Sequence, residues 1–180
     1  MDKILVVVDY QNDFVDGSLG FKKAEILEKG IYNKVKKYLN DGHKVIFTYD
    51  THDRDYLSSR EGKKLPVEHC IVNTKGHELY GSLSEFKDSK DTLHYNKESF
   101  SLAPRDILDI ASKVDNNIKE IEIVGVVTNI CVISNAVIFQ AQYPQAEIIV
   151  DANLTAGFDE EMYKKALDVM ESFQVKIINR

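Results

Sequence analysis

The stretch that most constrains the fold is Ile121–Ala141, in which an apolar, β-branched run passes directly into an apolar-rich helical segment. The run is bounded by Gly125, Thr128 and Asn129 and is typical of a buried strand. Cys131 stands at the start of the helical segment, where the free N–H groups of a helix N-terminus would point at its thiol. Such a position lowers the pKa of a cysteine and can hold an oxyanion. The alternative is a small, inert core cysteine.

Five further segments have the character of strands. Lys3–Asp9 and Lys44–Asp50 are nearly uninterrupted apolar runs that each end in a carboxylate, and Asp91–Lys97 is a weaker segment that ends in a lysine. Glu147–Asp151 and the closing residues Val175–Ile178 complete the set. Because apolar runs without polar alternation suit strands that are buried on both faces, they favour a parallel sheet.

Helical spacing of apolar residues appears between these runs at residues 27–39, 104–114 and 160–173. The polar stretches 10–21 and 51–90 lack that spacing, and we expect loops there; so long a loop in a compact domain is usually functional. Strands that alternate with helices predict an α/β fold, a three-layer α/β/α sandwich with a mainly parallel sheet of about six strands. We expect one domain over residues 1–180.

The composition narrows the class of partner and the compartment. A net charge of −6 argues against nucleic acid or an anionic membrane as the main partner. Cys70 and Cys131 form no disulfide framework pattern and fit a reducing cytoplasm. The apolar run at residues 4–8 is too short for a signal peptide or a membrane span. A cytoplasmic protein is predicted, and a homo-oligomer stays an open alternative.

Polar residues end several of the predicted strands. Asp9, Asp50 and Lys97 end three strands, and Cys131 follows a fourth. Ligands bind beyond the carboxyl ends of the strands in such sheets, so these side chains would converge on one rim if the strands are neighbours. Polar residues at strand ends can also be plain caps for the next element.

At this point three motifs resemble those of the isochorismatase-like cysteine hydrolase superfamily. They are Val8–Phe14, the lysine Lys97 at the end of the third strand, and Gly125–Val132. The motifs arrive in the order of that superfamily, and the resemblance covers nearly the whole chain. It implies an isochorismatase-like fold and a catalytic triad of Asp9, Lys97 and Cys131.

Within that superfamily the chain is most similar to nicotinamidases. These carry an Asp-x-His motif after the second strand and a further histidine downstream, and here Asp50, His52 and His69 match that pattern. Some nicotinamidases add a glutamate, for which Glu61 is suitably placed. The resemblance implies a divalent metal, with zinc expected first and iron or manganese as alternatives. Taken singly, each histidine could equally be a solvated loop residue.

The resemblance also implies a reaction, the hydrolysis of nicotinamide, a small carboxamide, to nicotinate and ammonia through a cysteine thioester. Cys131 would be the nucleophile, Asp9 would move the proton, and Lys97 would favour the thiolate. Backbone N–H groups of Val127 and Cys131 would bind the oxyanion, beside a cis peptide bond expected between Val126 and Val127. The metal would orient the pyridine nitrogen or a bound water.

The substrate pocket is where the chain departs from the pattern. Phe14 and Phe100 are candidates to stack on an aromatic ring, although composition alone makes core positions equally probable for both. Leu65 stands where relatives often have tryptophan, and Asn129 stands where many have aspartate. The Lys-x-x-Tyr-Ser-x-Phe pattern appears only as residues 97–101. These changes concern the substrate more than the triad.

Three rival functions remain at this stage. The first is a metal-free relative that acts on another small amide or on isochorismate. The second is a phosphatase with a His69-Cys70 loop, which would need an arginine at the position that Gly76 occupies. The third is a flavodoxin-like binding domain, which would use Asp9 and Lys97 at strand ends but give Cys131 no role.

Overall fold

The computed structural model describes residues 3–114 and 117–180, and their backbone forms a six-stranded parallel sheet with the order β3–β2–β1–β4–β5–β6. The strands are β1 (Lys3–Val8), β2 (Lys44–Asp50), β3 (Thr92–Lys97), β4 (Glu120–Val126), β5 (Glu147–Ala156) and β6 (Lys176–Ile178). The predicted α/β class and the mainly parallel sheet of about six strands are confirmed.

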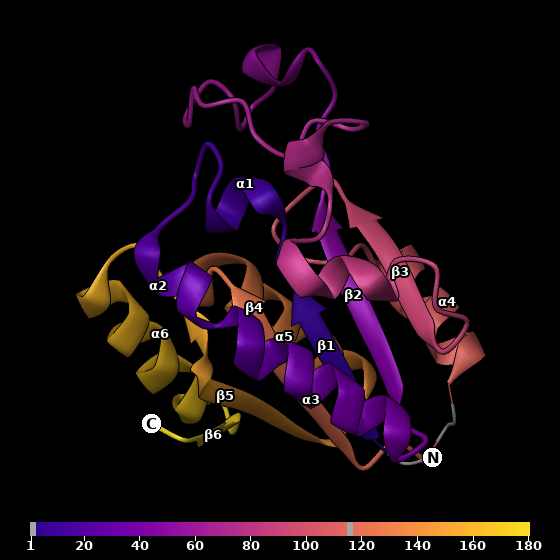
Figure 1. The fold of residues 1–180 in the computed structure, drawn as a ribbon. Coiled ribbons are helices and arrows are strands. Elements are labelled where there is room, and N and C mark those ends of the chain that lie inside the picture. Colours follow the sequence, from indigo (N-terminus) through magenta and orange to yellow (C-terminus); the bar gives the residue numbers. More distant parts are fainter. Residues whose placement is uncertain (1–2, 115–116) are drawn as a thin grey trace.

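Helices cover both faces of this sheet. They are α1 (Asn12–Val15), α2 (Lys22–Ile26), α3 (Glu28–Asn40), α4 (Pro104–Lys113), α5 (Ile133–Gln142) and α6 (Glu160–Ser172). In Figure 1, α3 crosses the near face of the sheet while α4 and α5 lie behind it, so the three layers are as predicted. Among the described residues, no helix is both long enough and apolar enough to cross a membrane.

The central strand β1 shows why the apolar runs are uninterrupted. Leu5 and Val7 pack into the cluster that holds the buried side of α3, whereas Ile4, Val6 and Val8 pack into the cluster under α4, α5 and α6. All five side chains are fully buried. A strand covered on both faces needs apolar residues at every position, which is the pattern that the sequence carries.

The order of the strands places a crevice between β1 and β4. The chain winds outward from β1 to β2 and β3, then returns to the other side of β1 with β4, and ligands bind at such a reversal beyond the carboxyl ends. Gly125 lets the two strands approach closely there, because a Cβ on it would lie 2.2 Å from the carbonyl oxygen of Val8. Its φ of 107° also suits only glycine.

The connection between β2 and β3 rises above these carboxyl ends (Figure 1). It is irregular apart from the 3₁₀ turns η1 (Tyr56–Ser58), η2 (Lys75–His77) and η3 (Gly81–Phe86), in agreement with the long loop predicted for residues 51–90. Isolated bridges from His52 to Ile71 and from Gln11 to Leu79 tie it down. The connection between β2 and β3 therefore lies over the crevice.

Two predicted boundaries were wrong. The stretch 10–21, expected as a loop, contains the short helix α1. The strand expected at 147–151 continues to Ala156, where Thr155 pairs with Gly125 and Ala156 with Val126. The polar residue Asp151 interrupts the apolar pattern and hid this continuation. Its carboxylate is nevertheless buried, because it accepts a hydrogen bond of 2.6 Å from Lys34 of α3.

Candidate active site

The ammonium group of Lys97 lies at the centre of the buried polar groups in the crevice. Its Nζ lies 2.7 Å from Oδ2 of Asp9 and 3.2 Å from Oδ1 of Asp50. It also lies 3.0 Å from the carbonyl oxygen of Ser99 and 3.6 Å from Sγ of Cys131. The three residues predicted as a triad are therefore brought together, and each of them is buried.

The backbone turns sharply at Asp9 as it leaves β1. Asp9 has a left-handed φ of 47°, which directs its side chain into the crevice rather than along the strand. The hydroxyl of Thr48 on β2 donates a hydrogen bond of 2.6 Å to Oδ1 of Asp9. With Oδ1 held by Thr48 and Oδ2 by Lys97, the carboxylate has one orientation, facing the thiol.

Burial changes the protonation of this group of side chains. Burial raises the pKa of the Cys131 thiol well above its usual range; Lys97 opposes this rise, and the carboxylates of Asp9 and Asp50 add to it. The lowered thiol pKa expected from the helix terminus was therefore wrong. Burial likewise raises the pKa of Asp9 despite the attraction of Lys97. A carboxylate with a raised pKa is a better acceptor for the thiol proton.

Cys131 is presented by an unusual start to its helix. The peptide bond between Val126 and Val127 is cis, as expected, and a π-helical turn, η4 (Thr128–Val132), precedes α5. One turn further on, the buried amide of Asn135 donates a hydrogen bond of 2.8 Å to the carbonyl oxygen of Cys131. The π-helical start was not predicted, since its apolar spacing does not differ from that of an α-helix.

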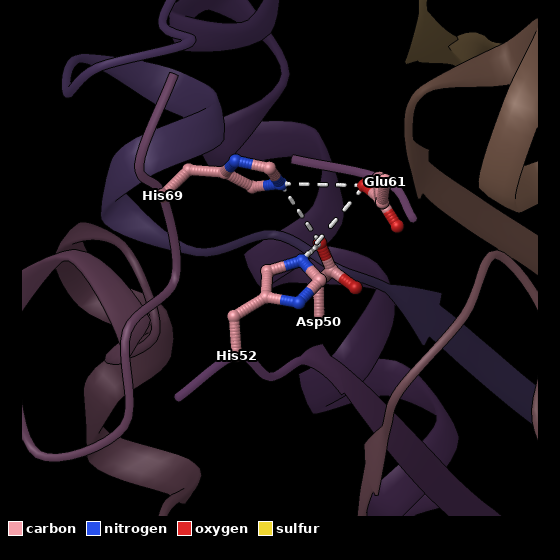
Figure 2. Close-up of side chains that lie close together, drawn as sticks. All are labelled: Asp50, His52, Glu61 and His69. Carbon is pink, nitrogen blue, oxygen red and sulfur yellow. Dashed lines mark hydrogen bonds and ion pairs between the residues drawn. The ribbon is translucent and has the colours of Figure 1, made fainter. Parts of the chain in front are cut away.

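A second group of polar side chains lies beside the triad. Asp50 ends β2, while His52, Glu61 and His69 come from the connection above it (Figure 2). Their potential ligand atoms all lie within 4.8 Å of one another. Nε2 of His52 and Nε2 of His69 lie 3.1 and 3.2 Å from Oδ2 of Asp50, and 3.9 and 3.8 Å from Oε1 of Glu61.

These donors fit a divalent transition metal. Ligand atoms about 2.0–2.2 Å from such an ion lie about 3.3–3.6 Å apart in a tetrahedral arrangement, close to the separations of these atoms. Nδ1 of His69 lies 2.8 Å from the carbonyl oxygen of Val67, so its N–H donates there and the lone pair of Nε2 faces the other donors. Burial raises the pKa of Asp50, but Lys97 and both histidines outweigh burial and keep this carboxyl ionised.

An apolar cavity of about 50 Å³ opens between the two groups. The three residues predicted to contact substrate, Phe14, Leu65 and Phe100, all line it. Its other lining residues are Leu19, Asp50, Glu61, His69, Val127, Ile130, Cys131 and Phe158. Cys131, three of the four donor residues and an apolar surface thus share one cavity, as in small-molecule sites generally.

The sequence profile of the isochorismatase domain matches residues 3–180. The chain belongs to the isochorismatase family. It is a hydrolase of that family, as the motifs predicted, and the family match extends over nearly all of the residues described above.

Other members resemble this isochorismatase-family chain along its whole length. A nicotinamidase of Saccharomyces cerevisiae is 25% identical over 99% of this chain and 100% of its own. The crystal structure of nicotinamidase/pyrazinamidase PncA from Bacillus subtilis superposes with a TM-score of 0.87 at 29% identity, covering 98% of this chain and 99% of that one. The pyrazinamidase of Pyrococcus horikoshii in complex with zinc has a TM-score of 0.85 at 26% identity, covering 100% of both chains.

Sequence reasoning missed several residues of this isochorismatase-family site. Leu19, Ile130 and Phe158 line the cavity, and Thr48 orients Asp9. Phe158 follows the carboxyl end of β5 and so lies at the crevice, but the predicted strand ended at Asp151 and gave no signal for it. Thr48 had no sequence signal of a functional role, because threonine is common within strands.

Proposed function

We propose that this protein is a nicotinamidase, a metal-assisted cysteine amidohydrolase that converts nicotinamide to nicotinate and ammonia. One observation carries the proposal: the buried Asp9–Lys97–Cys131 group and the four-residue donor group share the carboxylate of Asp50 and open on the same cavity. The similar proteins that bear the names nicotinamidase and pyrazinamidase support it. The resemblance implies a role in NAD salvage, and a cytoplasmic location stays a prediction.

Asp50, His52, Glu61 and His69 would hold the metal. Two imidazoles and two carboxylates leave a divalent ion with no net charge, and such a donor set suits zinc, with iron and manganese as alternatives. The structure of the Pyrococcus horikoshii pyrazinamidase in complex with zinc favours zinc. When bound, the ion would act as a Lewis acid beside the cavity and would orient the ring nitrogen of the substrate.

The apolar wall of the cavity would hold the pyridine ring. Phe14 and Phe100 face it with aromatic side chains, and Leu65 closes it from the loop above. An aromatic ring that stacks on these side chains leaves water and places its carboxamide carbon near Sγ of Cys131. This arrangement would bind a flat heteroaromatic amide in preference to a flexible aliphatic one.

Acylation follows from the positions of three groups. As Sγ of Cys131 attacks the carboxamide carbon, its proton passes to Asp9, and the carbonyl oxygen becomes an oxyanion that accepts hydrogen bonds from the N–H groups of Val127 and Cys131. The C–N bond then breaks, and Asp9 gives the proton to the departing nitrogen, which leaves as ammonia. Lys97 stays a cation throughout, because the neighbouring anions outweigh burial and raise its pKa.

Deacylation uses the same groups in reverse. A water molecule attacks the thioester carbon and gives a proton to Asp9 while the same N–H groups hold the second oxyanion. The C–S bond breaks, the proton returns from Asp9 to the thiolate of Cys131, and nicotinic acid leaves and gives up its carboxyl proton to water as nicotinate. The raised pKa of Asp9 suits both directions of proton transfer.

The test is ammonia release with metal content measured on the same preparation. Protein purified without chelator is assayed on nicotinamide, pyrazinamide and an aliphatic amide of similar size, and its zinc, iron and manganese are determined by elemental analysis. We expect turnover of the aromatic amides and one metal ion per chain. Turnover of an amide by protein that holds no metal and takes up none would support the metal-free relative instead.

A further inference from the structure

Three consecutive polar residues after β1 connect the crevice to the segment 69–78. The first, Gln11, is fully buried. Its Oε1 accepts a hydrogen bond of 2.8 Å from the backbone N–H of Asp50, and its Nε2 donates to the carbonyl oxygens of Asp50 and His77, each at 2.9 Å. One side chain thus fixes the end of β2 against the segment that follows His69.

The second residue, Asn12, attaches the far part of the same segment. Its Nδ2 donates to the carbonyl oxygens of Lys75 and Glu78 at 2.7 and 3.1 Å, and its backbone N–H donates to Glu78 at 2.9 Å. These bonds hold η2 beside α1, so the segment 69–78 is fastened at its distal end independently of any metal.

The third residue, Asp13, acts next to a proposed metal ligand. Its Oδ2 accepts a hydrogen bond of 2.7 Å from the backbone N–H of Cys70, the residue that follows His69. Cys70 has a left-handed φ of 47°, a conformation that residues with a Cβ adopt unfavourably without such a partner. The neighbouring ring of Phe14 packs edge-on against the His69 ring, with centroids 5.5 Å apart.

The carboxylate of Asp13 is also closely fitted against η2. A Cβ on Gly76 would lie 1.9 Å from Oδ2 of Asp13, so this carboxylate occupies the space that any other residue at position 76 would need. Gly76 has no side chain to displace it. Because Gly76 lacks a Cβ, the Asp13 carboxylate can occupy the position from which it accepts the hydrogen bond of Cys70.

We propose that Asp13 is a positioning residue that holds His69 in place for a divalent transition metal by binding the amide of Cys70, while Gln11 holds Asp50 toward the same point. The inference rests on the metal-assisted function proposed above. Asp13 itself contacts neither metal nor substrate in this role; it acts through the backbone. Groups that orient metal ligands in this way typically change metal affinity by about 10–100-fold when removed.

The experiment measures Zn²⁺ affinity by competition with a chromophoric chelator, using the full chain freed of metal beforehand. We expect Asp13→Ala to bind Zn²⁺ about 10–100-fold more weakly than wild type. Asp13→Asn should recover most of the affinity, because its amide oxygen can still accept from Cys70. Asp16→Ala, which removes an exposed carboxylate at the end of the same helix, is the matched control and should bind as wild type does.

These variants separate positioning from simple charge. If Asp13 acted only as a negative charge near the cation, Asp13→Asn would lose as much affinity as Asp13→Ala, and the proposal would be overturned. Gly76→Ala gives an independent test, since its methyl group must push the carboxylate away from Cys70 without removing any charge. We expect a loss of Zn²⁺ affinity comparable to that of Asp13→Ala.

Hydrogen exchange at the amide of Cys70 in the metal-free protein completes the test. We expect this amide to be protected from exchange in wild type and Asp13→Asn but to exchange at least about tenfold faster in Gly76→Ala. The Gly76→Ala measurement still tests the proposal if Asp13→Ala fails to fold. Unchanged Zn²⁺ affinity in Asp13→Ala or Gly76→Ala overturns the proposal alone. Failure of the wild type to bind any Zn²⁺ overturns the metal-assisted function as well.

Discussion

Nζ of Lys97 lies 3.2 Å from Oδ1 of Asp50, while Oδ2 of the same carboxylate lies 3.1 Å from Nε2 of His52. Lys97 and Asp50 are register partners at the ends of β3 and β2, so the pairing follows directly from the sheet. One carboxylate therefore joins the group around Cys131 to the group proposed to hold a metal. A substitution in either group should therefore alter the geometry and the electrostatics of the other group.

The first prediction concerns the choice of nucleophile. Cys131→Ala should abolish amide hydrolysis and leave the fold intact, because the thiol is the proposed nucleophile and alanine removes only its sulfur atom from a buried position. Cys70→Ala should keep turnover, since Cys70 does not line the cavity and is not part of the Asp9–Lys97–Cys131 group. Ammonia release and circular dichroism measure both effects. Residual turnover by Cys131→Ala within about tenfold of wild type would argue against covalent catalysis.

The second prediction concerns the buried ion pair. Asp9→Asn and Lys97→Ala should each lower kcat/KM by about 10²–10⁴-fold, the usual contribution of acid–base help. Because both residues act on the same proton of Cys131, the double variant should lose much less than the sum of the two free-energy changes. Each single variant removes one partner of a buried ion pair, so the free energy of unfolding must be measured alongside. Strictly additive losses would show that the two residues serve separate steps.

The sequence alone predicted the layers of the fold and the convergence of its site. Apolar runs such as Lys3–Asp9 indicate strands buried on both faces, and the end of a parallel strand fixes which rim its last side chain faces. That is why Asp9, Asp50 and Lys97 could be placed near Cys131 before any coordinates, and the structure does bring them together.

Other features depend on tertiary contacts that no local pattern carries. The sequence placed Cys131 where a helix terminus would lower its pKa, but burial of the thiol raises that pKa, and the carboxylates of Asp9 and Asp50 add to the rise. The continuation of β5 was hidden by Asp151, whose burial depends on Lys34 of α3. Asp13 had no signal at all, since its partner, the amide of Cys70, lies 57 residues away.

The third prediction concerns the metal ligands. His52→Ala and His69→Ala should each lose the bound metal, because two imidazoles supply the neutral donors of the group. His43→Ala, at the opposite end of β2, is the control histidine and should retain it. Elemental analysis of protein purified without chelator measures the content. Added Zn²⁺ should raise the melting temperature of wild type and of His43→Ala but not of the two ligand variants.

A metal retained at one ion per chain in both ligand variants would contradict the assignment of this site. Cys131 should react with a thiol-alkylating agent at least as fast in the ligand variants as in wild type, because its neighbours Asp9 and Lys97 are not removed. Loss of that reactivity would instead show that the connection above the crevice has collapsed onto the thiol.

The last prediction concerns the dependence of stability on pH through His94, which lies on β3 away from the proposed ligands. Its Nδ1 lies 2.8 Å from the hydroxyl of Tyr49, its Nε2 lies 2.8 Å from the hydroxyl of Thr92, and its ring stacks on Phe47. Burial lowers the pKa of His94 below the ordinary value of 6.5. The unfolded chain therefore binds a proton at pH values at which the folded chain does not.

Stability must then fall as pH drops from about 6.5 toward the lowered pKa of His94, and level off below it. One proton sets a ceiling of about 1.4 kcal/mol per pH unit, and partial exposure of the ring makes the slope smaller. His94→Gln, which cannot titrate, should flatten this part of the profile, while His77 contributes equally to both proteins. Urea unfolding between about pH 5 and pH 7.5 measures the difference, and identical slopes for wild type and variant would show that His94 is protonated equally in the folded and unfolded chains.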